Sequence, residues 1–153
     1  MIQTVIDLLN EARITELEAV NQYMIHHYEL KNKDFGKLAS KIKEIAVVEM
    51  KHAEKLAERI LLLKGEPISK PDTTPKTGQK IPEMLTTDTG LEEQAVRMYN
   101  DAAVICAAEK DHKSKELFEE LLSDEEKHLS LFENIKNHVD KLGPAYMATL
   151  TGK

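Results

Sequence analysis

The stretch Val47–Lys55 reads V-V-E-M-K-H-A-E-K and places Glu49 and His52 three residues apart. On an α-helix both side chains project from one face and can share a ligand. The same spacing returns far downstream, where residues 125–128 read E-E-K-H. One Glu-x-x-His is a weak signal, because Glu, Lys and His are common on solvated helix faces. Two copies suggest that both pairs belong to one site, a hypothesis that the rest of the chain can test.

The composition is that of an ordinary helical protein. The chain has 153 residues, of which 41% are apolar and 31% charged, and it contains no Trp. These values predict one domain over residues 1–153 with an all-α fold. The net charge of −6 argues against nucleic-acid binding. No apolar run is long enough to cross a membrane. The single cysteine and the lack of signal-peptide features predict a cytoplasmic protein.

Apolar residues recur at helical spacing in four long segments. We expect helices at about 2–33, 35–64, 83–111 and 114–142, with a short fifth helix at 145–150. The segment 65–82 holds four of the five prolines and cannot be helical. It is long enough to carry the chain from one end of a bundle to the other. The predicted architecture is therefore two helical hairpins joined by a long crossover, the ferritin-like variant of the four-helix bundle.

Each of the four predicted long helices has ionisable residues at a single level of its apolar stripe. In the second helix they lie between Ile45 and Leu56, and in the fourth between Leu121 and Phe132. The six residues that interrupt the stripes are Glu16, Glu49, His52, Glu92, Glu125 and His128.

The six residues also follow an internal repeat. The differences 92 − 16, 125 − 49 and 128 − 52 all equal 76, and Tyr23 and Tyr99 are separated by the same number. This offset predicts a duplicated helical hairpin that carries its polar residues in register. Within each half the glutamates are 33 residues apart, since 49 − 16 and 125 − 92 agree. Antiparallel helices would therefore bring Glu16 level with Glu49, and Glu92 level with Glu125.

Four carboxylates buried together would cost several kcal/mol for each uncompensated ion. Protonation would relieve part of that cost. Two divalent cations would balance all four charges, with the imidazoles as neutral ligands. Carboxylate and imidazole without thiolate suit iron or manganese better than a structural zinc site. The alternative is six solvated charges that share a period, but their positions in apolar stripes disfavour it. The sequence predicts a di-metal carboxylate centre.

At these residues the chain resembles the bacterioferritins, over nearly its whole length. The matching segments include E-L-E-A-V-N-Q-Y at 16–23, E-M-K-H-A-E at 49–54 and D-E-E-K-H at 124–128. The resemblance implies a ferroxidase that oxidises Fe²⁺ with O₂ or H₂O₂ and stores ferric mineral in a hollow homo-oligomeric shell of 24 subunits. A reductase or ferredoxin would serve iron release. By carry-over, one iron would be bound by Glu16, Glu49 and His52 and the other by Glu92, Glu125 and His128, with Glu49 and Glu125 bridging.

Two further residues gain roles from the resemblance. Met50 follows Glu49 directly, so it points about 100° away from the core face. By position it is a flexible apolar residue at a subunit interface, whereas the resemblance implies the axial ligand of a b-type haem shared between two subunits. Tyr23 lies two turns beyond Glu16. The resemblance implies a redox-active or hydrogen-bonding tyrosine there, and a core tyrosine is the alternative.

Other polar residues receive no role in the centre. His26, His27, His112 and His138 lack a partner at ligand spacing and are expected at the surface or at helix ends.

The chain departs from the family pattern at two positions. Some bacterioferritins have His and Asp as an inner-surface iron site where this chain has Glu44 and Val48.

Three rival interpretations remain open. The same bundle can serve a di-iron or di-manganese oxidoreductase, because function belongs to the site rather than to the scaffold. A haem electron-transfer module with a vestigial metal site is the second rival. A purely structural bundle, which would bind no metal, is the third.

Overall fold

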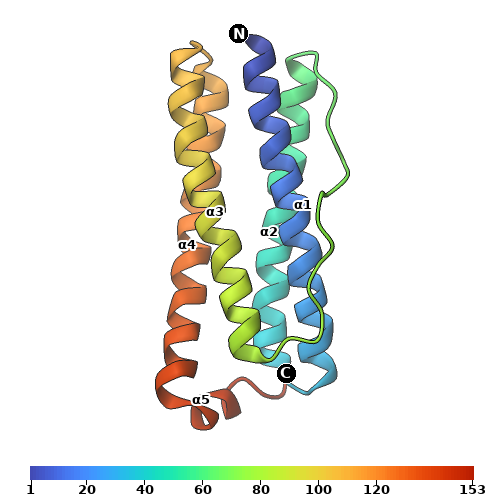
Figure 1. Cartoon of the computed structure of the whole chain (residues 1–153), viewed down its shortest axis with the longest axis vertical. Helices are drawn as coiled ribbons and strands as arrows, with labels where there is room; N and C mark the ends of the chain where they lie inside the picture. The colour runs from blue at the N-terminus through green and yellow to red at the C-terminus, as the bar shows by residue number, and fades with distance from the viewer.

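The computed structural model describes all 153 residues, and its elements are five helices. The four long helices run side by side as one elongated bundle, in which α1 packs along α2 and α3 along α4 (Figure 1). None of them combines the length and apolar character that a membrane-spanning segment requires. The predicted all-α fold with two hairpins and a crossover is confirmed. The helices are α1 (Ile2–Asn32), α2 (Gly36–Leu62), α3 (Ile81–Ala108), α4 (His112–Leu142) and α5 (Pro144–Ala148).

Helix α3 begins earlier than its proline suggests. It starts at Ile81, and Pro82 lies in its first turn, where the missing N–H costs nothing and the fixed φ suits a helix. The Glu83 carboxylate accepts a hydrogen bond from the backbone N–H of Lys80 at 2.9 Å. The proline therefore starts the helix instead of ending the crossover.

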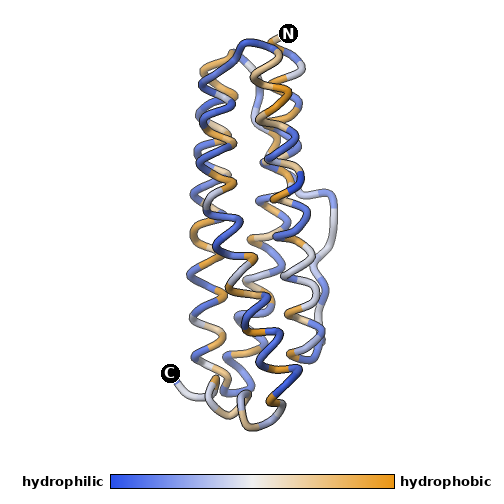
Figure 2. The backbone as a smooth tube through the Cα atoms, turned by 90° about the vertical axis from the view of Figure 1, so that its left-hand side faces the viewer, coloured by the Kyte–Doolittle hydropathy of each residue, from blue (hydrophilic) through white to orange (hydrophobic).

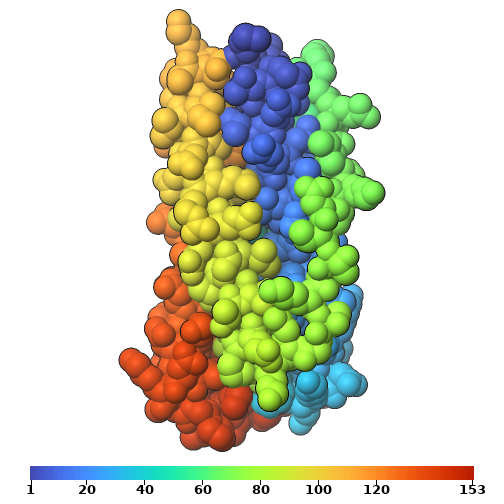
Figure 3. Space-filling model, viewed as in Figure 1, coloured from blue at the N-terminus to red at the C-terminus, as the bar shows by residue number.

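The crossover runs along α1 from one end of the bundle to the other (Figures 1 and 3). Polar side chains of α1 hold its backbone. The side chain of Asn10 accepts from the N–H of Ile68 at 2.8 Å, and that of Gln22 accepts from the N–H of Lys76 at 2.8 Å. These contacts satisfy backbone N–H groups of the crossover, which forms no regular structure. Because the crossover runs the length of the bundle, α3 starts at the end where α1 finishes.

The buried apolar residues form two clusters, one on each side of the polar layer. One contains Tyr23 and Phe132, whose ring centroids are 5.5 Å apart. The other contains Tyr99 and Phe118, at 5.7 Å. Figure 2 shows apolar and polar residues interleaved along each helix, as amphipathic packing requires. Because apolar packing closes both sides, the polar layer is enclosed within the bundle.

The C-terminal segment closes one end of the bundle. After α5 the chain turns back over the connection between α1 and α2 (Figure 1). The carbonyl of Leu150 accepts from the N–H groups of Lys37 and Leu38 at 3.2 and 3.4 Å. The N–H of Gly152 donates to the carbonyl of Asp34 at 2.9 Å. The two bonds to Leu150 use orphan N–H groups in the first turn of α2.

Candidate metal centre

The six ionisable residues identified from the sequence meet at one level of the bundle. Taken as whole residues, backbone included, none is more than 9% exposed. Helix α1 contributes one of them, α2 two, α3 one and α4 two, so all four long helices are needed to build the site. The six are Glu16, Glu49, His52, Glu92, Glu125 and His128.

Their ligand atoms form two overlapping groups. Within each group, one oxygen or nitrogen from every residue lies within 4.8 Å of the others. We name the groups after their histidines. The His52 position comprises Glu16, Glu49, His52 and Glu125, and the His128 position comprises Glu49, Glu92, Glu125 and His128. Glu49 and Glu125 belong to both.

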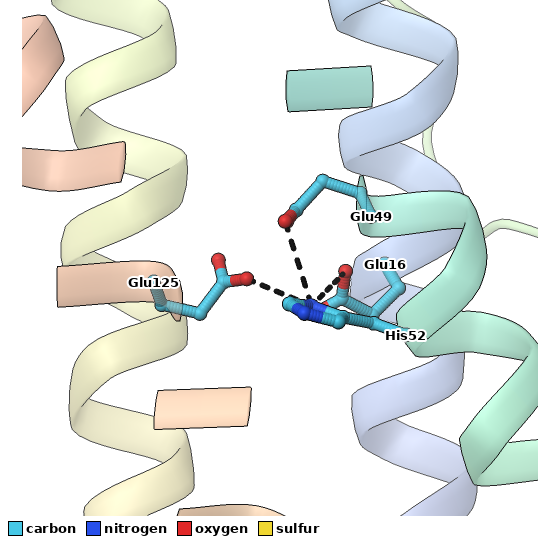
Figure 4. Close-up of side chains that lie close together, drawn as sticks. All are labelled: Glu16, Glu49, His52 and Glu125. Carbon is cyan, nitrogen blue, oxygen red and sulfur yellow. Dashed lines mark ion pairs between the residues drawn. The ribbon is translucent and has the colours of Figure 1, made fainter. Parts of the chain in front are cut away.

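Both imidazoles turn the same nitrogen toward the carboxylates. His52 Nδ1 lies 3.0 Å from Glu125 Oε1 and 3.5 Å from oxygens of Glu16 and Glu49 (Figure 4). His128 Nδ1 lies 3.1 Å from Glu49 Oε1. The two rings face each other with centroids 6.5 Å apart. The side chains therefore converge on a shared space from opposite sides.

The atoms that converge there are unsatisfied. Each of the six residues has at least one buried oxygen or nitrogen without a hydrogen-bond partner, including His52 Nδ1, His128 Nδ1 and both oxygens of Glu125. Buried polar atoms normally find partners, and a buried carboxylate without one is costly. A donor set of carboxylate oxygens and imidazole nitrogens without thiolate fits divalent iron or manganese. The residues present fit a pair of such ions.

Two tyrosines hold the outer glutamates across the hairpins. The Tyr23 hydroxyl on α1 donates to Glu92 Oε1 on α3 at 2.6 Å. The Tyr99 hydroxyl on α3 donates to Glu16 Oε1 on α1. Burial, with the nearby carboxylates, raises the pKa of both tyrosines well above the usual value. Both hydroxyls therefore stay protonated and remain donors.

Without metal, the electrostatics of the site favour protons. Burial, followed by the charge of Glu16, raises the pKa of Glu49 well above its usual value. The same two causes raise the pKa of Glu125. Burial lowers the pKa of His52, but the carboxylates of Glu125 and Glu16 outweigh it and raise that pKa to about 10. The metal-free centre thus holds protons that cations would replace.

One supporting residue was not predicted from the sequence. The outward nitrogen of His52, Nε2, donates to Asp124 Oδ2 at 2.8 Å. Asp124 precedes Glu125 on α4, so its place beside a metal-ligand candidate was visible in the sequence. The contact of Asp124 with His52 on α2 could not be read from the sequence, because it depends on how α2 and α4 are rotated relative to each other.

The structure contradicts the surface placement of two histidines. His26 is completely buried, and its Nδ1 lies 3.0 Å from Asp88 Oδ2. Asp88 is itself buried on α3, so the ion pair compensates a polar residue on the inward face of α1. His27 is also buried, and its Nδ1 donates to the carbonyl of Ala39 at 2.7 Å. His112 and His138 are exposed, as expected.

Met50 lies outside the centre. Its side chain is 54% exposed on α2, although Glu49 beside it is buried. The next exposed apolar residue on the same helix is Val47. The thioether therefore faces away from the bundle interior.

A sequence model of the ferritin-like domain family matches residues 6–142. The chain is 40% identical to the bacterioferritin of Desulfovibrio desulfuricans over 97% of its own length and 83% of that protein. It is 38% identical to the bacterioferritin of Brucella melitensis over 91% of this chain and 86% of that protein.

Solved structures give the same picture. The X-ray structure of the D. desulfuricans bacterioferritin, reported with its diiron site in different catalytic states, has a TM-score of 0.97 at 39% identity and covers 99% of this chain and 89% of that chain. Bacterioferritin BfrA of Mycobacterium tuberculosis has a TM-score of 0.93 at 33% identity, covering 97% and 94% respectively.

Proposed function

The chain belongs to the bacterioferritins, iron-storage members of the ferritin-like family, and from that premise we propose that it is a ferroxidase. In this proposal residues 1–153 act as one domain that binds two Fe²⁺ ions at the centre of the bundle. O₂ or H₂O₂ accepts the electrons, and ferric product is stored in a shell built from copies of the chain.

One observation carries the proposal. Two groups of four buried ligand atoms share Glu49 and Glu125, and each of the six residues has a buried atom without a hydrogen-bond partner. Sharing two carboxylates brings two cations close together. Two neighbouring ferrous ions can deliver two electrons to one oxidant molecule, which a single ion cannot do.

In this proposal the protein residues bind the two ions, orient them and neutralise their charge. Glu49 and Glu125 would bridge the ions, while Glu16 and Glu92 would each bind one ion from the outside. The four carboxylates balance the four positive charges of two Fe²⁺ ions, so the enclosed site becomes neutral when filled. When bound, iron supplies the redox chemistry and open coordination positions for the oxidant.

The outer glutamates are held in place by hydrogen bonds from two buried tyrosines. The hydroxyl of Tyr23 occupies one oxygen of Glu92, which leaves Oε2 of that carboxylate buried and free for an ion. The hydroxyl of Tyr99 likewise occupies Oε1 of Glu16 and leaves Oε2 of that carboxylate buried and free for an ion. Second-layer contacts of this kind fix ligand orientation.

The function can be tested with a matched pair of substitutions. Glu125→Gln alters a shared ligand, whereas Glu126→Gln alters the exposed neighbour on the same helix. Each metal-free protein is mixed with Fe²⁺ in air, and ferric absorbance is followed by stopped flow. We expect Glu125→Gln to slow the first phase by at least about 10-fold and Glu126→Gln to match wild type. Equal rates in all three proteins would contradict the ferroxidase assignment.

Storage itself is tested by particle mass. We propose a closed shell of 24 copies, since closed symmetry is usual for homo-oligomers. Analytical ultracentrifugation before and after iron loading should give a large particle whose mass rises while its hydrodynamic size stays constant. A small oligomer that releases all its iron would favour a di-iron or di-manganese oxidoreductase instead.

We also propose a haem site at Met50. A half-exposed thioether beside exposed Val47 suits an apolar contact with a second copy of the chain, and a thioether is an accepted axial ligand of haem iron. Two copies would each supply one Met50, and the bound b-type haem would carry electrons.

The haem proposal is tested by reconstitution. Met50→Leu keeps the apolar volume but removes the sulfur. After incubation with haem, wild type should show the absorbance bands of a bis-methionine haem and Met50→Leu should not, while both oxidise Fe²⁺ at the same initial rate. Identical haem spectra for the two proteins would refute the assignment of Met50.

A further inference from the structure

The two halves of the centre differ in how they hold their histidines. The Nε2–H of His52 donates to Asp124 Oδ2 at 2.8 Å. This contact joins α2 to α4, and Asp124 directly precedes Glu125 in the chain. The His52 ring is thereby held on both edges, with Nδ1 turned to the centre and Nε2 turned to Asp124.

The internal repeat shows what the other half lacks. The equivalent of Asp124 is Val48, since 124 − 76 = 48, and it directly precedes Glu49 as Asp124 precedes Glu125. Valine has no acceptor. The ion-pair contacts of His128 are all made by its Nδ1, and its Nε2 makes no hydrogen bond to a protein atom. The His128 side chain is also the more exposed of the two, at 11% against 2% for His52.

Other supporting contacts are matched between the halves. Tyr23 donates to Glu92, and Tyr99 donates to Glu16. Glu49 and Glu125 belong equally to both positions. The difference therefore lies in the support of the two imidazoles, at the pair of residues Asp124 and Val48.

A carboxylate on the outer nitrogen of a ligating histidine has three effects. It fixes the tautomer, so that Nδ1 presents its lone pair to the ion; it fixes the ring orientation; and it makes the imidazole a stronger donor. Removing such a partner typically lowers metal affinity about 10- to 100-fold. His128 receives none of these three contributions.

We propose that the two metal positions are unequal and that Asp124 is the positioning residue that makes them so. The His52 position binds a divalent cation about 10- to 100-fold more tightly than the His128 position, and it fills first. The inference rests on the proposed di-iron function and adds an order of filling to it. The substitutions below exchange the side chains of Asp124 and Val48, which occupy equivalent positions in the internal repeat.

The first test measures affinity without turnover. The assembled metal-free protein is titrated anaerobically with Co²⁺, which reports its ligand field by visible absorbance and is not oxidised by the site. Wild type should bind two ions per chain in two resolved steps. Asp124→Val should weaken the tighter step about 10- to 100-fold, so that the steps merge. Asp124→Asn keeps an oxygen acceptor for Nε2–H and should recover most of the loss, and Glu126→Val, at an exposed neighbour, should leave both steps unchanged.

The second test moves the partner to the other half. Val48→Asp should tighten the weaker step, and the double variant Val48→Asp with Asp124→Val should reverse which position fills first. Crystals of the assembled protein with one equivalent of Co²⁺ per chain identify the filled position by anomalous diffraction. Wild type should show cobalt beside His52, and the double variant should show it beside His128.

The outcomes separate this inference from the function on which it rests. Equal occupancy of the two positions in wild type, or unchanged steps in Asp124→Val, would overturn the inference while leaving a di-metal centre in place. Equal losses in Asp124→Asn and Asp124→Val would overturn the positioning role of Asp124, because they would mean that its charge acts on His52 without the hydrogen bond that orients the ring. Failure of the assembled wild type to bind any Co²⁺ would instead contradict the metal centre itself.

Discussion

Replacing Tyr23 with Phe removes one hydroxyl from the interior and little else. The side chain is fully buried, and its hydroxyl donates to Glu92 Oε1 at 2.6 Å. Phe keeps the ring and its packing against Phe132, where the centroids are 5.5 Å apart. The Glu92 carboxylate already has one unpartnered oxygen, Oε2, so the substitution leaves both oxygens without hydrogen bonds in the metal-free protein.

The expected cost follows from that loss. A hydrogen bond to a charged group contributes about 1.5–3 kcal/mol, and a buried acceptor that loses its donor incurs its full desolvation penalty. We therefore expect Tyr23→Phe to lower the free energy of unfolding of the metal-free protein by about 2 kcal/mol.

The assay is urea unfolding of metal-free protein, followed by far-ultraviolet circular dichroism. Chain concentration is held constant because assembly contributes to apparent stability. Tyr28→Phe is the control, since Tyr28 is 58% exposed and an exposed substitution is expected to change stability by no more than about 0.5 kcal/mol. If Tyr23→Phe and Tyr28→Phe unfold at the same urea concentration, the buried hydrogen bond to Glu92 does not contribute and the argument fails.

Three other predictions concern pH, a buried ion pair and the C-terminal segment. The pKa of His52 in the folded protein is raised from 6.5 to about 10, so between these pH values the folded metal-free protein holds a proton on His52 that the unfolded chain has lost. The urea midpoint of the metal-free protein should therefore fall as pH rises through this window. A midpoint that rises with pH would contradict the raised pKa. Asp88→Ala leaves His26 buried without its partner and should cost about 3–5 kcal/mol in urea unfolding; a loss below about 1 kcal/mol would mean that the pair is dispensable. Gly36→Ala places a Cβ against the carbonyl of Gly152 and should release the C-terminal residues, seen as faster amide exchange at Gly152; unchanged exchange would contradict tight docking.

The sequence alone determined the helices and the level at which they turn polar. Both are local properties, because apolar periodicity specifies a helix face and an ionisable residue within that stripe is directed inward. The 76-residue offset then placed Glu16, Glu49, His52 and their equivalents in one layer, since a duplicated hairpin repeats its register. The structure brings those six residues together.

Contacts between helices of different hairpins were decided only by the tertiary structure. His26 and Asp88 are 62 residues apart and fall outside the repeat, whose equivalents at those positions are Ala102 and Ala12. Their contact depends on the rotation and axial shift of α1 against α3, which neither helix encodes by itself. The bond from His52 to Asp124 depends in the same way on α2 and α4. Periodicity therefore selected the residues that face inward, and the packing of the hairpins selected their partners.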